Sequence, residues 1–277
     1  MNTELSLAFI GGGNMATALA TGLIGTHCTA NNVHVVDIDP AALQRWREKG
    51  ATVAAQPDNT LTQKRIWVLS VKPQFLEAAV AACKPYLQPN TLVISVAAGI
   101  PAATLSHWLG SETQPFTRLV RCMPNTPALI GAGVSGLYAL EGVTQADAEL
   151  AHQLLSAVGQ VVWVNSDAQI DAVTALSGSG PAYVFLFLQS LIEGAIELGL
   201  SPEQARTLAL ATVDGATRLA GQSDEDLATL RQRVTSKGGT TAAALAVFEE
   251  QGFASCVNQA MRAAKHRAAQ LAEEFSK

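Results

Sequence analysis

The sequence predicts a two-domain fold, in which an α/β domain with a mostly parallel sheet is followed by an all-α domain. Short β-branched segments alternate with alanine-rich helical patterns as far as Asn165, and beyond it strand-like segments stop while helical patterns continue. Such alternation is typical of a parallel sheet covered by helices. The length of 277 residues also exceeds a typical domain of about 100–200 residues. We expect domains at residues 1–165 and 166–277.

The predicted strands share short runs of valine, isoleucine and leucine. They are Leu5–Ile10, Val33–Val36, Ile66–Val71, Leu92–Val96, Leu119–Arg121, Gly133–Leu140 and Val161–Val164. The predicted helices of the first domain are Asn14–Leu23, Ala41–Lys49, Phe75–Tyr86 and Thr144–Val158. In the second domain, Gly199 ends one helix and Ser201-Pro202-Glu203 begins the next, because proline suits the first helical position.

Composition excludes several classes of protein. The chain is 48% hydrophobic and 15% charged, which argues against disorder, and its net charge of −5 with no basic block argues against nucleic acid as a partner. The N-terminus lacks the basic region of a secretion signal. Four cysteines stand far apart without a disulfide framework, so we expect reduced thiols and a cytoplasmic location.

The most apolar stretch, Tyr183–Leu200, has two readings. It is interrupted by Gln189, Glu193 and Glu197, whose four-residue spacing marks one face of a helix. A membrane span is one reading, and a buried or interface helix is the favoured one. Because the helical half is apolar on many faces, we expect a homodimer that exchanges helices, and no membrane partner.

A glycine triplet follows the first predicted strand. Gly11-x-Gly13-x-x-Ala16 between a strand and a helix is the dinucleotide-binding fingerprint, in which bare backbone approaches the pyrophosphate at a helix N-terminus. A tight turn without a ligand is the alternative. In a Rossmann-like NAD(P)-binding domain, this segment supplies the cofactor contacts, and the residues expected to make them are Ile10, Gly11, Gly12, Gly13, Asn14 and Met15.

Asp37 strengthens this interpretation. It lies 21 residues beyond Ala16, close to the spacing expected of an acid that binds the ribose 2′-hydroxyl. With Asp39 two residues on, a 2′-phosphate meets negative charge unless Arg45 or Arg47 swings round, so the residues favour NADH over NADPH.

Two further strand ends are expected to face the cofactor. Ser70, Val71, Lys72 and Pro73 close one strand, where ligands bind in such sheets. A solvated lysine in a turn is the alternative for Lys72. Small residues after the next strand, among them Ala97 and Gly99, would let a flat nicotinamide approach the backbone.

Three later segments are rich in glycine, proline and hydroxyl residues: Met123–Ala128, Ser177–Ala182 and Ser236–Thr241. The last precedes a predicted helix, Ala242–Glu250, so its amides and the helix dipole form a candidate anion site. A threonine-capped helix after a flexible loop is the alternative.

These segments give the chain a specific resemblance. Together with FIGGGNMATALATGL and SVKP, the stretches MPNTPA, LSGSGPAY and VTSKGGTTAAALAVFEEQGF resemble the pyrroline-5-carboxylate reductase family along nearly the whole chain. The resemblance implies reduction of 1-pyrroline-5-carboxylate to L-proline, the last step of proline biosynthesis, by hydride from NADPH or NADH. It also implies dimers that join into larger assemblies.

The substrate residues are assigned on that basis. An iminium carbon accepts hydride readily, so the site needs positioning and a hydrogen-bond donor more than a strong base. Thr241 is the candidate donor, and the amides of Gly239, Thr240 and Thr241, with Ser236, are expected to hold the carboxylate. Asn125, Ser177 and Ser179 either line the space between cofactor and substrate or satisfy backbone groups in their own turns.

Two departures from the family pattern stand out. Lys237 occupies a position where relatives commonly have proline, and Asp37-Ile38-Asp39 stands where relatives often carry residues suited to NADPH. The preference between NADH and NADPH therefore stays open.

Two rival functions were weighed. A β-hydroxyacid dehydrogenase would need a catalytic lysine and asparagine where this chain has Val184 and Leu188, neither capable of acid–base chemistry. A non-catalytic nicotinamide sensor would keep the glycine fingerprint and lose the segment Ser236–Thr241, which is intact. The five histidines lack metal-ligand spacing, so no metal is expected.

Overall fold

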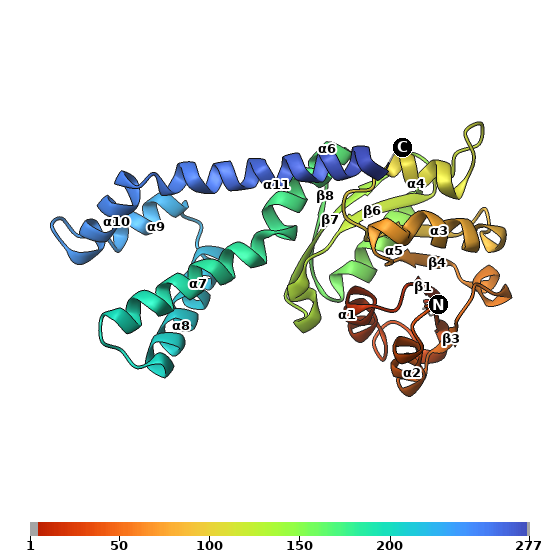
Figure 1. Cartoon of the computed structure of the whole chain (residues 1–277), viewed down its shortest axis with the longest axis horizontal. Helices are drawn as coiled ribbons and strands as arrows, with labels where there is room; N and C mark the ends of the chain where they lie inside the picture. The colour runs from red at the N-terminus through yellow and green to blue at the C-terminus, as the bar shows by residue number, and fades with distance from the viewer. Residues whose placement is uncertain (1–4, 276–277) are drawn as a thin grey trace. The chain divides into compact units, whose positions relative to one another are not determined.

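The computed structural model describes residues 5–275, and within them eight strands form one sheet (Figure 1). The strand order is β3-β2-β1-β4-β5-β6-β7-β8, and every neighbouring pair is parallel except β6 and β7. The first six positions follow the strand order of a doubly wound dinucleotide-binding sheet. In such a sheet the order of the strands reverses between β1 and β4, while these two strands stay parallel. The predicted fold class, a Rossmann-like domain followed by a helical region, is confirmed.

The strands are β1 (Leu7–Ile10), β2 (Val33–Val36), β3 (Thr52–Ala54), β4 (Ile66–Leu69), β5 (Leu92–Ser95), β6 (Leu119–Met123), β7 (Gly133–Ala139) and β8 (Gly159–Trp163). The helices are α1 (Asn14–Leu23), α2 (Pro40–Glu48), α3 (Pro73–Cys83), α4 (Ala102–Leu109), α5 (Gln145–Ser156), α6 (Asp167–Val173), α7 (Gly180–Glu197), α8 (Pro202–Gln222), α9 (Leu227–Arg233), α10 (Thr240–Glu250) and α11 (Phe253–Phe275). Short 3-10 turns include η3 (Lys84–Tyr86) and η4 (Thr126–Ile130), and a π-helical turn η5 (Thr174–Gly178) follows α6.

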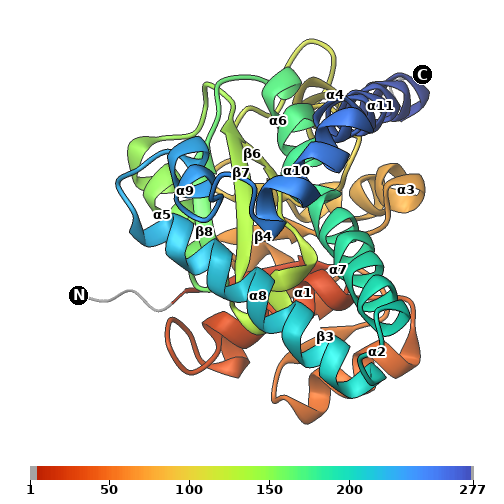
Figure 2. The ribbon, with the colours of Figure 1, turned by 90° about the vertical axis from the view of Figure 1, so that its left-hand side faces the viewer.

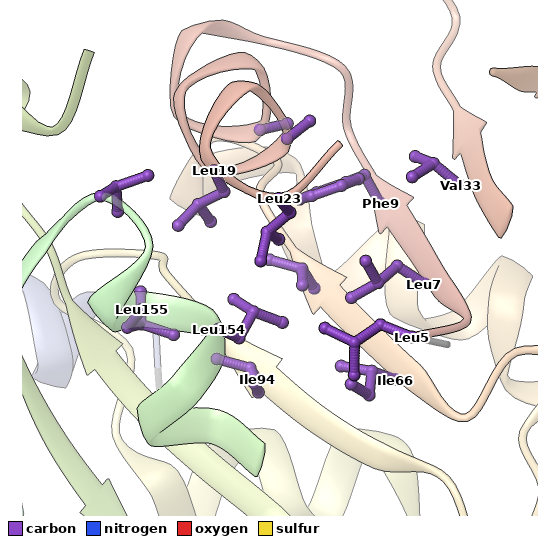
Figure 3. Packing of buried hydrophobic residues seen from close by; sticks show 14 of the residues in the cluster. Leu5, Leu7, Phe9, Leu19, Leu23, Val33, Ile66, Ile94, Leu154 and Leu155 are labelled. Atoms are coloured by element: carbon purple, nitrogen blue, oxygen red, sulfur yellow. The ribbon is translucent and has the colours of Figure 1, made fainter. Parts of the chain in front are cut away.

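Alternate residues of the strands pack on opposite faces of the sheet. Phe9 of β1 belongs to a cluster with Leu19 of α1 and Leu154 of α5, which Figure 3 shows from close by. Ile10 belongs to a second cluster with Leu76 of α3, on the other face. Because side chains alternate along a strand, two buried faces require apolar residues at every position, which explains the continuous apolar runs.

The chain divides into two compact units. The first contains the described residues as far as Ser179 together with those from Ala264 onward, and the second is Gly180–Ala263. The last strand ends at Trp163, close to the expected boundary after Asn165, whereas the units divide after Ser179. The difference arises because α6 and η5 pack beside β6 and β7 and so belong to the sheet-containing unit.

The second unit is entirely helical, and α7 and α8 lie side by side in it (Figures 1 and 2). Gly199 adopts φ +99 between them, and Ser201 caps α8 through a reciprocal capping box with Gln204. These are the helix end and helix start that the sequence predicts. Although α7 is strongly apolar, no residue of it is buried.

Sequence reasoning missed some elements of the first unit. Neither the three-residue strand β3 nor helix α4 was predicted. The strand β3 is short and half-exposed, so it carries little hydrophobic pattern. The helix α4 has a serine, a threonine and a histidine among its eight residues, which obscures its apolar face.

Candidate active site

The glycine turn lies between β1 and α1, at the carboxyl end of the sheet. Gly11 adopts φ +97, and a Cβ built on it would lie 2.9 Å from the backbone of Ser70 and Val71. Gly12 packs against Trp46, whose indole Nε1 donates a hydrogen bond to the Gly12 carbonyl at 2.9 Å. The turn is therefore fixed from two sides, by β4 and by α2.

Gly13 differs from its neighbours, because a Cβ there would meet no atom within 4 Å. It is the N-cap of α1, and no side chain caps that helix. Open space above bare backbone, next to unsatisfied amides at a helix N-terminus, fits a pyrophosphate. Ala16, the third fingerprint position, is fully buried, as close packing of the helix on the sheet requires. The residues present thus fit a dinucleotide, with Ile10 buried below the turn and Asn14 exposed on it.

Asp37 follows β2, beside this turn. Its carboxylate accepts hydrogen bonds from the Gly12 amide at 2.6 Å and the Asp39 amide at 2.8 Å. The acid is thus joined to the glycine turn by its own side chain.

The segments after β4 and β5 hold the remaining residues that the sequence predicts for the cofactor. The Ser70 hydroxyl donates to the Gly11 carbonyl at 2.7 Å, so Ser70 supports the turn directly. Lys72 is the exposed N-cap of α3, and Pro73 is its first residue. Ala97 is buried. Gly99 adopts φ +76, and a Cβ on it would lie 2.9 Å from the Leu271 Cβ, so the approach of α11 is what this glycine accommodates.

Asn125 joins two of the unusual segments. Its amide nitrogen donates to the Ser177 carbonyl at 3.1 Å, and its carbonyl oxygen accepts from the Val134 amide at 2.9 Å. The Ser177 hydroxyl donates to the Val173 carbonyl at 3.0 Å. Of the two roles left open for these side chains, the contacts support the satisfying of backbone groups. Ser179 ends the π-helical turn, where its amide donates to the Thr174 carbonyl at 2.8 Å.

A buried ion cluster lies next to these segments. Arg121 of β6 is 2% exposed and pairs with Asp167 at 2.6 Å and Asp171 at 3.2 Å, both on α6. Asp167 also accepts from the Ala102 amide, at the start of α4, at 3.1 Å. One arginine thus ties β6, α6 and α4 together.

The second unit contains the candidate substrate segment. Gly238 adopts φ +71, and Gly239 is the N-cap of α10, with no side-chain cap. A Cβ at Gly239 would collide with the Ser236 hydroxyl, so Ser236 lies against the start of the helix. Thr240 and Thr241 are the first two residues of α10, with Thr240 exposed and Thr241 partly exposed. The helix is therefore not threonine-capped, and the amides of Thr240 and Thr241 at its start suit an anion. The Gly239 amide, also predicted to hold the carboxylate, instead donates to the Ser236 carbonyl at 3.0 Å.

Burial makes two cysteine thiols of the first unit unreactive. Burial raises the pKa of Cys83 and of Cys122 to about 12, so both thiols are neutral at physiological pH and poor nucleophiles. Among the described residues no group of three or more potential ligands could hold a metal ion.

Sequence reasoning missed four residues that shape the site: Ile38, Trp46, Arg121 and Leu271. Ile38 has a visible signal, because it is a large apolar residue between two aspartates, and it is 85% exposed. Trp46, Arg121 and Leu271 act over 34, 46 and 172 residues of sequence, respectively, and no local pattern reveals such partners.

Comparison with known proteins gives concordant matches to both parts of the chain. Residues 167–271 match the family model for pyrroline-5-carboxylate reductase dimerisation, and residues 6–99 match the model for NADP oxidoreductase, coenzyme F420-dependent. A pyrroline-5-carboxylate reductase of Pseudomonas aeruginosa is 47% identical over 272 residues, which cover 97% of each chain.

Solved structures agree with this match. A pyrroline-5-carboxylate reductase from Coxiella burnetii superposes with a TM-score of 0.88 at 38% identity, covering 97% of this chain and 99% of that one. The pyrroline carboxylate reductase of Plasmodium falciparum, solved with NADP bound, gives a TM-score of 0.85 at 28% identity, covering 98% and 99%.

Proposed function

The chain belongs to the pyrroline-5-carboxylate reductase family, and from this premise we propose that it reduces 1-pyrroline-5-carboxylate to L-proline. A bound reduced nicotinamide would supply the hydride for the imine carbon and would itself be oxidised. Reduction of the C=N bond would leave the electron pair and a proton on the ring nitrogen, which gives a saturated ring amine. The residues that hold the dinucleotide are those of the glycine turn, Asp37 and the ends of β4 and β5.

The observation that carries the proposal is a pair of uncapped helix starts, Gly13 on α1 and Gly239 on α10. Each presents backbone amides and the positive end of a helix dipole, which suits an anionic group. The first fits the pyrophosphate of the cofactor, and the second fits the carboxylate of the substrate. Both ligands of the reaction carry such a group.

Thr241 is proposed as the hydrogen-bond donor to the imine nitrogen. A hydroxyl on the first turn of α10 stands next to the amides proposed to hold the carboxylate, and in the substrate the carboxylate and the nitrogen are attached to the same carbon. Ser236 and Lys237 are the neighbouring side chains, and a lysine adds positive charge beside an anion site. Asn125, Ser177 and Ser179 remain the proposed substrate contacts of the first unit, where Asn125 and Ser177 hold backbone groups.

The test is cofactor oxidation with 1-pyrroline-5-carboxylate, comparing Thr241→Ala with Thr241→Ser. We expect the alanine variant to lose kcat by a factor of about 10², the lower range for loss of a positioned proton-transfer group, and the serine variant to retain most of it. Full kcat in Thr241→Ala would remove the donor role. Absence of oxidation by the unaltered protein with either cofactor would overturn the proposed reaction.

Assembly and location complete the proposal. The dimerisation domain supports a homo-oligomer, and we propose a homodimer that joins into larger assemblies in the cytoplasm. The helical stretch Asp167–Glu197 is long and apolar enough to span a bilayer by length and composition. The dimerisation match covers the same residues, which supports the proposal that a protein interface, and no membrane, covers that apolar surface.

The alternative functions have less support. Val184 and Leu188 of α7 stand where a β-hydroxyacid dehydrogenase would need ionisable or amide side chains. A sensor without activity would have no need of the intact segment Ser236–Thr241.

A further inference from the structure

The carboxylate of Asp37 is held in one orientation. Its Oδ2 accepts from the Gly12 amide at 2.6 Å and its Oδ1 from the Asp39 amide at 2.8 Å. Charge-assisted hydrogen bonds of this length are about twice as strong as neutral ones. Rotation of the side chain would break both bonds, and the first of them joins the acid to the turn that precedes α1.

This placement has a consequence for the cofactor. In a doubly wound sheet, the adenosine ribose lies at the end of the second strand, and each carboxylate oxygen of Asp37 keeps a lone pair for a ribose hydroxyl. A 2′-phosphate at that position would bring negative charge against a carboxylate that cannot turn away. NADH satisfies the acid, and NADPH is repelled by it.

The charges around Asp37 reinforce the effect. Asp39, the N-cap of α2, adds a second carboxylate, which accepts from the Ala41 amide at 2.9 Å. The nearest basic residues in sequence, Arg45 and Arg47, lie in the last turn of α2, so at least five residues separate them from the N-cap. At 1.5 Å per residue they start about 8 Å or more along the helix from Asp39.

Ile38 lies between the two aspartates and is 85% exposed. An apolar side chain in this position offers a contact surface for the adenine ring, which NADH and NADPH share. It therefore contributes to affinity without contributing to the choice between them.

We propose that Asp37, oriented by the Gly12 and Asp39 amides, makes this chain select NADH over NADPH, with Ile38 supplying adenine contact for both. The inference rests on the proposed function only in that the chain binds a nicotinamide dinucleotide.

The test is direct binding of NADH and NADPH to the full-length protein without substrate, measured by isothermal titration calorimetry. We expect NADH to bind at least about tenfold more tightly than NADPH, as like-charge repulsion near a protein surface implies. Asp37→Asn removes the charge and keeps one of the two acceptor oxygens that face the Gly12 and Asp39 amides, so it should shift the ratio of the two dissociation constants toward NADPH by at least about tenfold. Asp37→Ser, smaller and also uncharged, should shift the ratio in the same direction.

Two control variants separate the charge of the Asp37 carboxylate from the charge of Asp39 and from apolar contact with the cofactor. Asp39→Asn removes the same charge two residues away and should change the ratio less than about threefold. Ile38→Ser should weaken both cofactors by the same factor and leave the ratio unchanged. A wild-type protein that binds NADPH as tightly as NADH, or a ratio unaffected in Asp37→Asn, would overturn the selectivity role. Failure of the wild type to bind either nucleotide would overturn the proposed function itself.

Discussion

Three consecutive glycines in the turn after β1 have three different physical requirements. Gly11 needs its left-handed backbone and its close approach to Ser70, Gly12 leaves room for Trp46, and Gly13 leaves room for a ligand. Only the last of these would be a requirement of the proposed cofactor binding. A single fingerprint therefore combines folding constraints with a binding constraint, and substitutions can tell them apart.

Gly11→Ala and Gly13→Ala form a matched pair. At Gly11 the new Cβ would lie 2.9 Å from backbone atoms in a conformation with φ +97, so we expect a loss of about 1–3 kcal/mol in the free energy of unfolding. At Gly13 the new Cβ meets no atom within 4 Å, so stability should stay unchanged while the dissociation constant for the dinucleotide rises. Urea unfolding and calorimetric titration measure the two quantities. Equal loss of stability in both variants would contradict this division of roles.

At the scale of the elements, the Arg121 cluster connects loops of the first unit to one another. It joins β6, which leads to Asn125, to α6 and to the start of α4, which follows Gly99. Asp167, the first residue of α6, also accepts from the Ala102 amide at the start of α4, so one carboxylate connects two helices. The two loops that flank the candidate site thus share one electrostatic support.

Removing Arg121 should be costly. Arg121→Leu leaves Asp167 and Asp171, which are 32% and 14% exposed, without their cation. Breaking a fully buried pair costs about 3–5 kcal/mol of unfolding free energy, so we expect a loss toward the lower end of that range. The matched control is Arg267→Leu, whose ion pair with Glu274 at 2.8 Å is exposed on both sides, so it should cost at most about 1 kcal/mol. Urea denaturation followed by circular dichroism compares the two. Similar losses in both variants would show that burial does not determine how much the Arg121 ion pairs contribute to the free energy of unfolding.

Periodicity predicted the elements of the first unit well because each strand is buried on both faces. The range Asn14–Leu23 is correct at both ends, and the predicted strand Leu5–Ile10 begins two residues early. The candidate site could be predicted only where local sequence carries the signal, as in the glycine turn. The roles of Trp46, Arg121 and Leu271 depend on contacts across the chain, and the use of Asn125 by backbone groups depends on the fold of η5.

At the scale of the whole molecule, the second unit lacks a core of its own. Three of its helices, α7, α9 and α10, have no buried residue, and Phe185 and Leu186 are 64% and 65% exposed. Burying an apolar side chain contributes about 1.5–3 kcal/mol, so a helical unit that leaves such residues in water lacks much of its stability. The dimerisation match to residues 167–271 indicates that a second copy of the chain supplies the missing contacts.

The stability of the protein should therefore depend on its concentration. When folding is linked to dimer formation, each tenfold rise in protein concentration adds about 1.4 kcal/mol per dimer. Because two chains unfold together, the Tm should rise by about 1–2 °C for each tenfold rise. Leu186→Asp should lower the Tm and shift light scattering toward the monomer, whereas Glu193→Gln on the exposed polar side of the same helix should do neither. Light scattering that shows a monomer at micromolar concentration, together with a Tm independent of concentration, would mean that the helical unit is stable with its apolar faces in water.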